Sequence, residues 1–193
     1  MEIILASASP RRKELLEQIG LSFQIKVSDV EEKITRTEPS EIVKELSGQK
    51  AEAVLQSLPA DGEVLVIGAD TIVACGKRIL GKPAGRKDAV EMLSALQGGT
   101  HEVYTGVTLL YRGASKGAKV ERKTFHEATR VHFYPMTEEE VREYVSTNDC
   151  MDKAGAYGIQ GFCARYISGI EGDYNNVVGL PVGRLYQEAK EWL

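Results

Sequence analysis

One acidic residue interrupts the most hydrophobic segment of the chain. Residues 63–74 form a continuous, β-branched run, typical of a central strand covered on both faces, and Asp70 lies within it. An ionised carboxylate in such surroundings costs several kcal/mol unless a cation or dense hydrogen bonding compensates it. A lysine would do so, and so would a divalent cation bound through phosphates. The alternative is an aspartate that caps a turn through Thr71.

A lysine lies inside a helical apolar stripe. Residues 39–58 repeat apolar side chains at helical spacing, and Lys50 falls between Leu46 and Val54 in that stripe. Its ammonium can reach solvent along the apolar surface. Alternatively it enters a polar cleft, where an anion is its natural partner.

The N-terminal segment combines groups that bind phosphate. Ser7, Arg11 and Arg12 lie at a strand-to-helix turn in which Pro10 takes the first helical position. Free N–H groups at a helix start attract phosphate, and arginine adds bidentate charge. The alternative is a capped surface helix with solvated arginines.

Further candidates lie elsewhere in the chain. Carboxylates could hold a cation while bases hold the oxygens of a polyphosphate, although spacing does not show that they converge. These candidates are Glu31, Asp70, Lys50, Lys82, Arg11 and Arg12. The glycine-rich residues 152–161 add Lys153 and Gln160, which could contact a base or ribose or could simply form a turn.

Two other patterns carry little functional weight. Residues 76–82 match G-x-x-x-x-G-K, but Pro83 replaces the hydroxyl residue that would bind Mg²⁺, and the flanking pattern predicts a hairpin. The histidines are isolated on strand-like segments, so we interpret them as members of polar strand faces.

The pattern of elements predicts an α/β fold with a mixed sheet. Strands are expected at residues 2–6, 23–27, 63–74, 79–80, 101–111 and 119–134, with a last strand before the C-terminal helix. Helices are expected from Pro10 to Gly20 and at residues 39–58, 87–96 and 137–146, and from about residue 181. We predict one domain over residues 1–193.

Composition narrows the classes of protein. The chain has 193 residues, is 42% hydrophobic and carries a formal charge of -4, so no global positive field would attract nucleic acid or an anionic membrane. No apolar run approaches the ~20 residues of a membrane helix, and the N-terminus lacks the order of a secretory signal. Three scattered cysteines indicate neither disulfides nor a zinc site. A cytoplasmic location is the expectation.

Six blocks, at residues 7–12, 30–32, 68–71, 81–83, 152–161 and 178–181, together resemble the Maf family of nucleoside triphosphate pyrophosphatases. They follow family order over nearly the whole chain. The resemblance implies a bent mixed sheet with flanking helices, in two lobes around a deep cleft, similar to inosine triphosphate pyrophosphatases. It also implies that Mg²⁺ or Mn²⁺ and an activated water cleave a nucleoside triphosphate between its α and β phosphates.

The resemblance further implies roles for single residues. Asp70 would accept a proton from water and bind the metal, with Glu31 as the second metal ligand. Lys50 and Lys82 would contact the triphosphate, and Lys82 would be a catalytic residue together with Asp70 and Glu31. Ser7 would line the phosphate and base side together with Arg11 or Arg12.

Substrate choice and cellular role are open to two kinds of alternative. Arg11, Thr71 and Gln160 lie where the branch acting on dTTP and UTP carries its specificity residues; a sibling branch acts on 7-methyl-GTP. A different alternative is a nucleotide-binding regulator of septum formation in cell division. A homodimer is also expected from the family, whereas no membrane or nucleic-acid partner is expected.

Overall fold

The computed structural model describes residues 1–28, 30–115 and 117–193, and these residues form a mixed sheet with flanking helices. Within them the strands are β1 (Glu2–Leu5), β2 (Gln24–Ile25), β3 (Val64–Cys75), β4 (Arg78–Leu80), β5 (Thr100–Arg112), β6 (Val120–Phe133) and β7 (Ile167–Glu171). The strand order is β2-β1-β3-β5-β6-β7, with β4 paired to β3. The predicted α/β fold with a mixed sheet is confirmed.

Helices follow the predicted segments closely. The α-helices in the described residues are α1 (Pro10–Gln18), α2 (Pro39–Gln56), α3 (Arg86–Leu96), α4 (Glu138–Ser146), α5 (Tyr174–Val178) and α6 (Val182–Ala189). Two short 3₁₀ turns, η1 (Ala154–Ala156) and η2 (Gly161–Tyr166), lie in and after the glycine-rich segment. Within the described part of the chain, no helix has the length and apolar character that crossing a membrane requires.

The chain folds into two compact units. Unit 1 comprises Met1–Asp70, Thr105–Glu127 and Gly179–Leu193, and unit 2 comprises Thr71–Tyr104 and Ala128–Val178. Strands β3, β5 and β6 each contribute residues to both. That residues 1–193 form a single domain stays a prediction.

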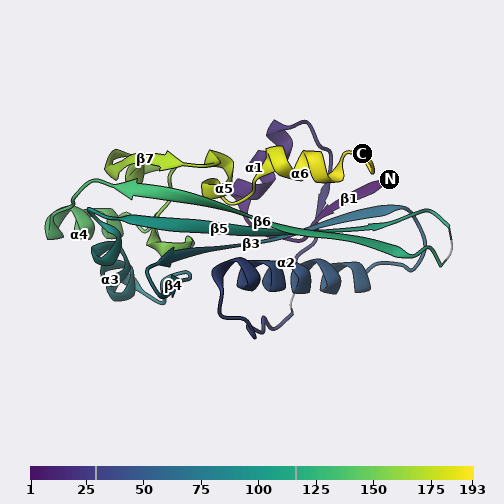
Figure 1. Ribbon diagram of the computed structural model, residues 1–193, viewed down its shortest axis with the longest axis horizontal. Helices are drawn as coiled ribbons and strands as arrows, with labels where there is room; N and C mark the ends of the chain where they lie inside the picture. Colours follow the sequence, from purple (N-terminus) through teal and green to yellow (C-terminus); the bar gives the residue numbers. More distant parts are fainter. Residues whose placement is uncertain (29, 116) are drawn as a thin grey trace. The chain divides into compact units, whose positions relative to one another are not determined.

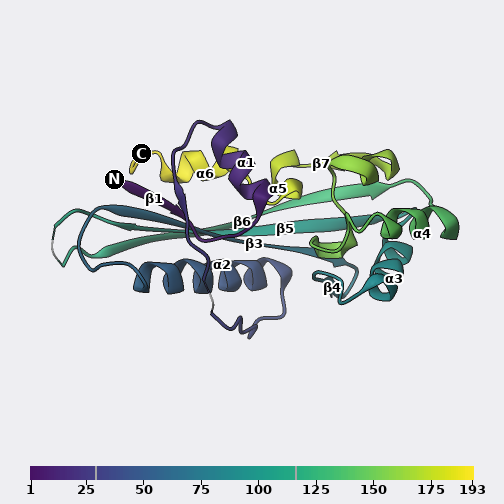
Figure 2. The ribbon, with the colours of Figure 1, turned by 180° about the vertical axis from the view of Figure 1, so that it is seen from behind.

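In unit 1, helices cover both faces of the strands. Helix α2 lies along one face, and α1 and α6 lie on the other (Figures 1 and 2). Strand β1 runs parallel to β3, with Glu2 opposite Val64 and Leu5 opposite Ile67. Buried apolar residues form a core cluster beneath α2; they are Ile4, Ala6, Ala51, Val54, Val64, Val66 and Leu110.

Glycine brings α2 unusually close to the sheet. A Cβ atom on Gly68 of β3 would lie 2.4 Å from the carbonyl oxygen of Ser47 and 2.8 Å from the Cβ of Ala51. A Cβ on Gly106 of β5 would lie 2.2 Å from the carbonyl oxygen of Val43. The helix therefore packs directly against the strand backbones, and this contact sets the position of Lys50.

Unit 2 has its own core around α3 and α4. Strands β3 and β4 form the predicted hairpin, with Cys75 opposite Arg78. The hairpin expected here is confirmed, and it differs from the strand, loop and helix in direct succession that a P-loop requires. Helix α4 starts with the predicted capping box, in which the Thr137 hydroxyl accepts from Glu140 N–H and the Glu140 carboxylate accepts from Thr137 N–H.

Three expectations need correction. Of residues 23–27, only Gln24 and Ile25 pair as a strand, a short one at the edge of the sheet, opposite Ile4 and Leu5 of β1. The short turns η1 and η2 and helix α5 were not predicted, since segments this short show no helical period. His101 is not on a polar face: it is 2% exposed and contacts the rings of Phe133 and Tyr157.

Candidate active site

Lys50 joins two carboxylates in unit 1. Its Nζ lies 2.5 Å from Oδ1 of Asp70 and 3.0 Å from Oε1 of Glu32. The side chains of Asp70 and Lys50 are 13% and 19% exposed, whereas that of Glu32 is 46% exposed. Lys50 is thus the cation that compensates the Asp70 carboxylate in the apolar strand. Its place in the apolar stripe of α2 is explained by these anionic partners.

Packing of α2 on β3 explains this pairing. Residues of a strand alternate between its faces, so Asp70 emerges on the same face as Gly68, where α2 makes its close approach. Lys50 precedes Ala51, which touches that glycine. Asp70 lies within β3 rather than at its end, so it is held by paired backbone on a rigid element.

Arg12 is buried at the N-terminal turn of unit 1. Its Nη1 donates to Oγ of Ser7 at 3.0 Å and to the carbonyl oxygen of Ala69 at 2.9 Å, and its Nε donates to the carbonyl oxygen of Gly179 at 2.8 Å. Burial lowers the pKa of Arg12, while the nearby Asp70 carboxylate opposes that shift. The structure thus brings two predicted residues, Ser7 and Arg12, next to the backbone that precedes Asp70. Arg11 is half-buried on α1.

Glu32, rather than the predicted Glu31, is the acid that pairs with Lys50; the site role of Glu31 stays a prediction. Glu31 is exposed, and it is the next residue, Glu32, that contacts Lys50. Both acids lie between β2 and α2 in a segment without helix or strand, where no periodicity tells adjacent residues apart. Their presence in one acidic block was the signal in the sequence, whereas only the tertiary structure shows which of them contacts Lys50.

The other predicted site residues belong to unit 2. Lys82 and Gln160 are exposed, and Thr71 is half-buried on β3 next to Asp70. The carbonyl oxygen of Gly81, beside Lys82, accepts a hydrogen bond from Gly155 N–H at 3.0 Å. Lys153 is 12% exposed, and its ammonium pairs with Asp149 and Asp152.

Two carboxylates of unit 1 lie close enough together to be compared with what a metal ion requires. Among the described residues, no group of three or more His, Cys, Asp and Glu side chains is placed to hold a metal ion. Asp70 and Glu32 nevertheless converge on one cation, the ammonium of Lys50. Mg²⁺ is commonly bound through one or two carboxylates with substrate phosphates completing its shell, so two acids fit such an ion.

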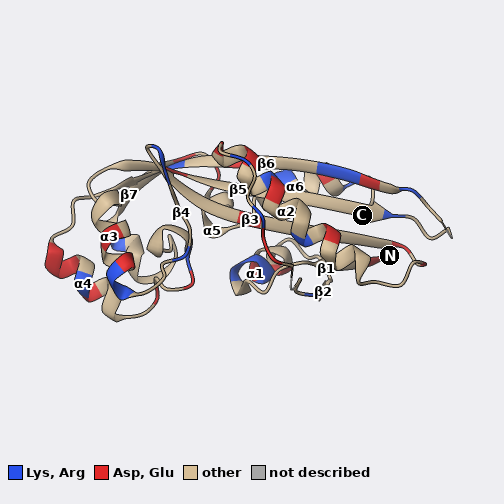
Figure 3. Cartoon of the chain, turned by 90° about the horizontal axis from the view of Figure 1, so that it is seen from below, with Lys and Arg blue, Asp and Glu red and all other residues tan. Residues whose placement is uncertain are grey.

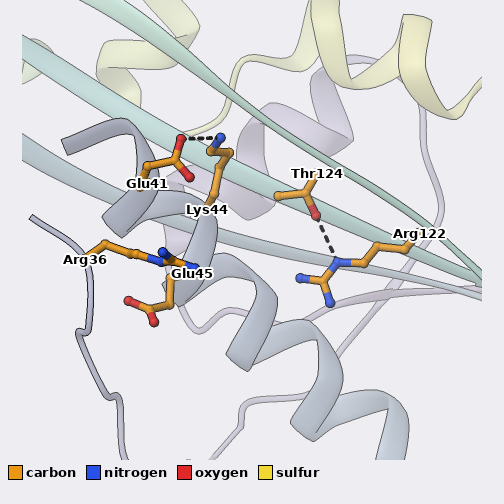
Figure 4. Close-up of a pocket in the computed structure, with 6 residues that line it drawn as sticks. All are labelled: Arg36, Glu41, Lys44, Glu45, Arg122 and Thr124. Carbon is orange, nitrogen blue, oxygen red and sulfur yellow. Dashed lines mark hydrogen bonds and ion pairs between the residues drawn. The ribbon is translucent and has the colours of Figure 1, made fainter. Parts of the chain in front are cut away.

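A separate hollow in unit 1 has a volume of about 330 Å³ (Figure 4). Its lining residues are Arg36, Glu41, Lys44, Glu45, Arg122 and Thr124. Lys44 pairs with Glu41 at 2.6 Å, and Arg122 pairs with Glu52. Elsewhere, too, basic and acidic residues are interspersed along the ribbon (Figure 3). Because Lys44 and Arg122 already pair with carboxylates, we assign this hollow no role in binding a polyphosphate.

Several relatives of this chain are named as pyrophosphatases. A dTTP/UTP pyrophosphatase of Agathobacter rectalis is 54% identical over 200 residues, which cover 98% of this chain and 97% of that protein. A protein of the same name from Lachnoclostridium phytofermentans is 48% identical over 191 residues, covering 99% and 95% of the two chains. One from Bacillus anthracis is 50% identical over 192 residues, with the same coverage.

The family is identified by a match that covers nearly the whole chain. A family model described as Maf-like protein matches residues 2–192. The chain therefore belongs to the Maf-like protein family. Among solved structures, a nucleoside-triphosphatase, dITP/XTP pyrophosphatase, from Mycobacterium abscessus aligns with a TM-score of 0.44 and 12% identity, over 98% of this chain and 94% of that chain.

Proposed function

We propose that this protein is a nucleoside triphosphate pyrophosphatase that hydrolyses dTTP and UTP to the monophosphate and pyrophosphate. The names of relatives at 48% to 54% identity support the substrate class. The observation that carries the chemistry is the Lys50 ammonium, which lies 2.5 Å from Asp70 and 3.0 Å from Glu32. It holds the Asp70 carboxylate between strand β3 and helix α2 and brings Glu32 next to it, so that Asp70 is placed for a proton transfer beside a polyphosphate.

The reaction breaks one phosphoanhydride bond. The oxygen of a water molecule forms a bond to the α-phosphorus while the bond between that phosphorus and the α–β bridging oxygen breaks. The bridging oxygen leaves with pyrophosphate. Asp70 accepts the proton that the water releases, and Lys50 fixes the position of that carboxylate. Positive charge from Lys50 and Lys82 offsets the charge that builds on the leaving pyrophosphate.

A divalent cation, Mg²⁺ or Mn²⁺, completes the proposed site. Asp70 and Glu32 are the proposed ligands, because both carboxylates contact the ammonium of Lys50. When bound, the ion would supply charge to the phosphate oxygens and lower the pKa of a bound water. Glu31, the acid expected from the sequence, is the competing assignment.

The remaining residues are proposed to bind and orient the substrate. Arg12 is held by hydrogen bonds to Ser7, Ala69 and Gly179, so it shapes the turn that carries Ser7. Arg11 is the proposed phosphate contact of that turn. Thr71 and Gln160 keep the proposed role in choosing pyrimidine nucleotides.

A nucleotide panel tests the proposal. We would assay dTTP, UTP, dATP and 7-methyl-GTP with Mg²⁺ or Mn²⁺ and separate pyrophosphate from orthophosphate release. The expected result is pyrophosphate from dTTP and UTP, lost on chelation. Preference for 7-methyl-GTP, or orthophosphate as the first product, would overturn the proposal.

A pair of neighbouring variants tests the metal ligands. We expect Glu32→Gln to raise the concentration of Mn²⁺ needed for half-maximal activity by at least about tenfold, because it removes one of two anionic ligands. Glu31→Gln makes the same chemical change one residue away and is expected to leave that concentration within about twofold. The reverse order would return the assignment to Glu31. A cytoplasmic location, a homodimer and a part in cell division stay predictions.

A further inference from the structure

The ammonium of Lys153 is occupied by the protein itself. Its Nζ lies 3.0 Å from Oδ1 of Asp149 and 2.9 Å from Oδ1 of Asp152, and it also donates to the carbonyl oxygen of Asp149. A lysine ammonium has three N–H donors, so these three acceptors use its full capacity. The side chain is 12% exposed. A phosphate could bind Lys153 only by displacing one of these acceptors.

The network continues from Asp149 back to the glycine-rich segment. The second carboxylate oxygen of Asp149 accepts from the hydroxyl of Tyr144 at 3.1 Å. That hydroxyl in turn accepts from the N–H of Gly158 at 3.3 Å. Tyr144 is fully buried on α4, and burial raises its pKa, so its hydroxyl stays a donor. The chain of contacts thus ties Gly158 to Tyr144 of α4, and Lys153 to Asp149, which follows that helix.

Two glycines show how tightly this segment is held. A Cβ on Gly158 would lie 2.7 Å from Cε of Lys153, so the lysine stem fills the space that a side chain would need. Gly155 has φ 69°, and a Cβ there would lie 2.8 Å from Cγ2 of Val73. The N–H of Gly155 also donates to the carbonyl oxygen of Gly81 at 3.0 Å. The segment is therefore fixed against β3 and against the residue before Lys82.

We infer that Lys153, Asp149 and Tyr144 form a clamp that positions residues 153–160 beside Gly81 and Lys82, and that Lys153 acts through this clamp rather than as a ligand of the triphosphate. All of these residues belong to unit 2. The inference rests on the proposed function for its effect on turnover. Through the clamp, Lys153 is a positioning residue for Lys82 and Gln160, the proposed phosphate and base contacts.

A double-mutant cycle separates a clamp from a ligand. The variants are Lys153→Met, which keeps the aliphatic stem, Asp149→Asn, and the two combined; Lys87→Met, on an exposed lysine of α3, is the matched control. We expect each single variant to lower kcat/KM for dTTP by about tenfold, and the double variant to be no worse than about twofold below either. If Lys153 bound phosphate directly, its loss would persist in the Asp149→Asn background, and this result would overturn the inference.

Two further readouts keep the test independent of overall stability. The ratio of kcat/KM for dTTP to that for 7-methyl-GTP should fall in the clamp variants, because a displaced segment misplaces Gln160. An unchanged ratio would indicate a purely structural role and would overturn the inference. Backbone hydrogen exchange of residues 153–160 should accelerate by about tenfold in Lys153→Met and Tyr144→Phe but not in Lys87→Met. This exchange measurement needs no substrate, so it tests the clamp even if the panel above rejects the proposed function.

Discussion

Replacing Asp70 with asparagine separates its charge from its shape. Asparagine keeps an oxygen that can accept from Lys50, whose Nζ lies 2.5 Å from Oδ1 of Asp70. It removes the negative charge and most of the ability to take a proton. Lys50 retains Glu32 at 3.0 Å, so its ammonium is not left unpaired. The change should therefore affect chemistry far more than folding.

The contacts set the expected magnitudes. A hydrogen bond from a charged donor to a charged acceptor becomes one to a neutral acceptor, a loss of about 1 kcal/mol in the free energy of unfolding. For a chain of this size that corresponds to roughly 2–4 °C in the melting temperature. Loss of a general base lowers turnover by about 10²- to 10⁴-fold. Because Asp70 is also a proposed metal ligand, we expect Asp70→Asn to lower turnover by about 10⁴-fold.

The assay measures pyrophosphate release from dTTP beside thermal unfolding of the same preparations. Asp61→Asn is the matched control, since it makes the same substitution on an exposed aspartate. We expect it to match the unmodified protein in both measurements. If Asp70→Asn were folded and turned over within about tenfold of the unmodified protein, Asp70 would not be the proton acceptor and the reasoning would be refuted.

Two other predictions concern stability. Gly68→Ala should lower the free energy of unfolding by about 3 kcal/mol, because its Cβ would lie 2.4 Å from the Ser47 carbonyl oxygen, whereas Gly183→Ala, with nothing within 4 Å, should be neutral or stabilising; equal melting temperatures would contradict the close packing of α2. Burial lowers the pKa of His101 from 6.5 to about 4. Between those pH values the unfolded chain binds a proton that the folded chain refuses, so stability should fall as pH drops from about 6.5 to about 4, by up to about 3 kcal/mol. The difference in unfolding free energy between His101→Phe and the unmodified protein, measured across this range, should show that slope; a constant difference would contradict it.

Local patterns in the sequence carried most of the fold. The capping box at Thr137 and Glu140, the hairpin near Gly76 and the apolar periods of α2 and β3 each depend on residues close in the chain. Such interactions are decided by backbone geometry and side-chain period, which a sequence displays directly. The short elements η1, η2 and α5 were missed because they lack enough residues for a period.

Pairings between residues far apart in the chain depend on the tertiary structure. The charge of Asp70 and its place in an apolar strand predict that it needs a cation. Its partner, Lys50, is 20 residues away on another element. Arg12 meets the carbonyl oxygen of Gly179 across 167 residues of chain. His101, read as a member of a polar strand face, proved to be buried against Tyr157.

The amino-acid sequence by itself determined the elements, the family resemblance and the need for charge compensation at Asp70. Only the tertiary structure decided that Lys50 compensates it, that Glu32 rather than Glu31 joins them, and that the protein itself occupies the ammonium of Lys153. The physical reason is the reach of each interaction. A cap or a period is complete within a few residues, whereas an ion pair between elements exists only after packing, here of α2 against Gly68, has brought their backbones together.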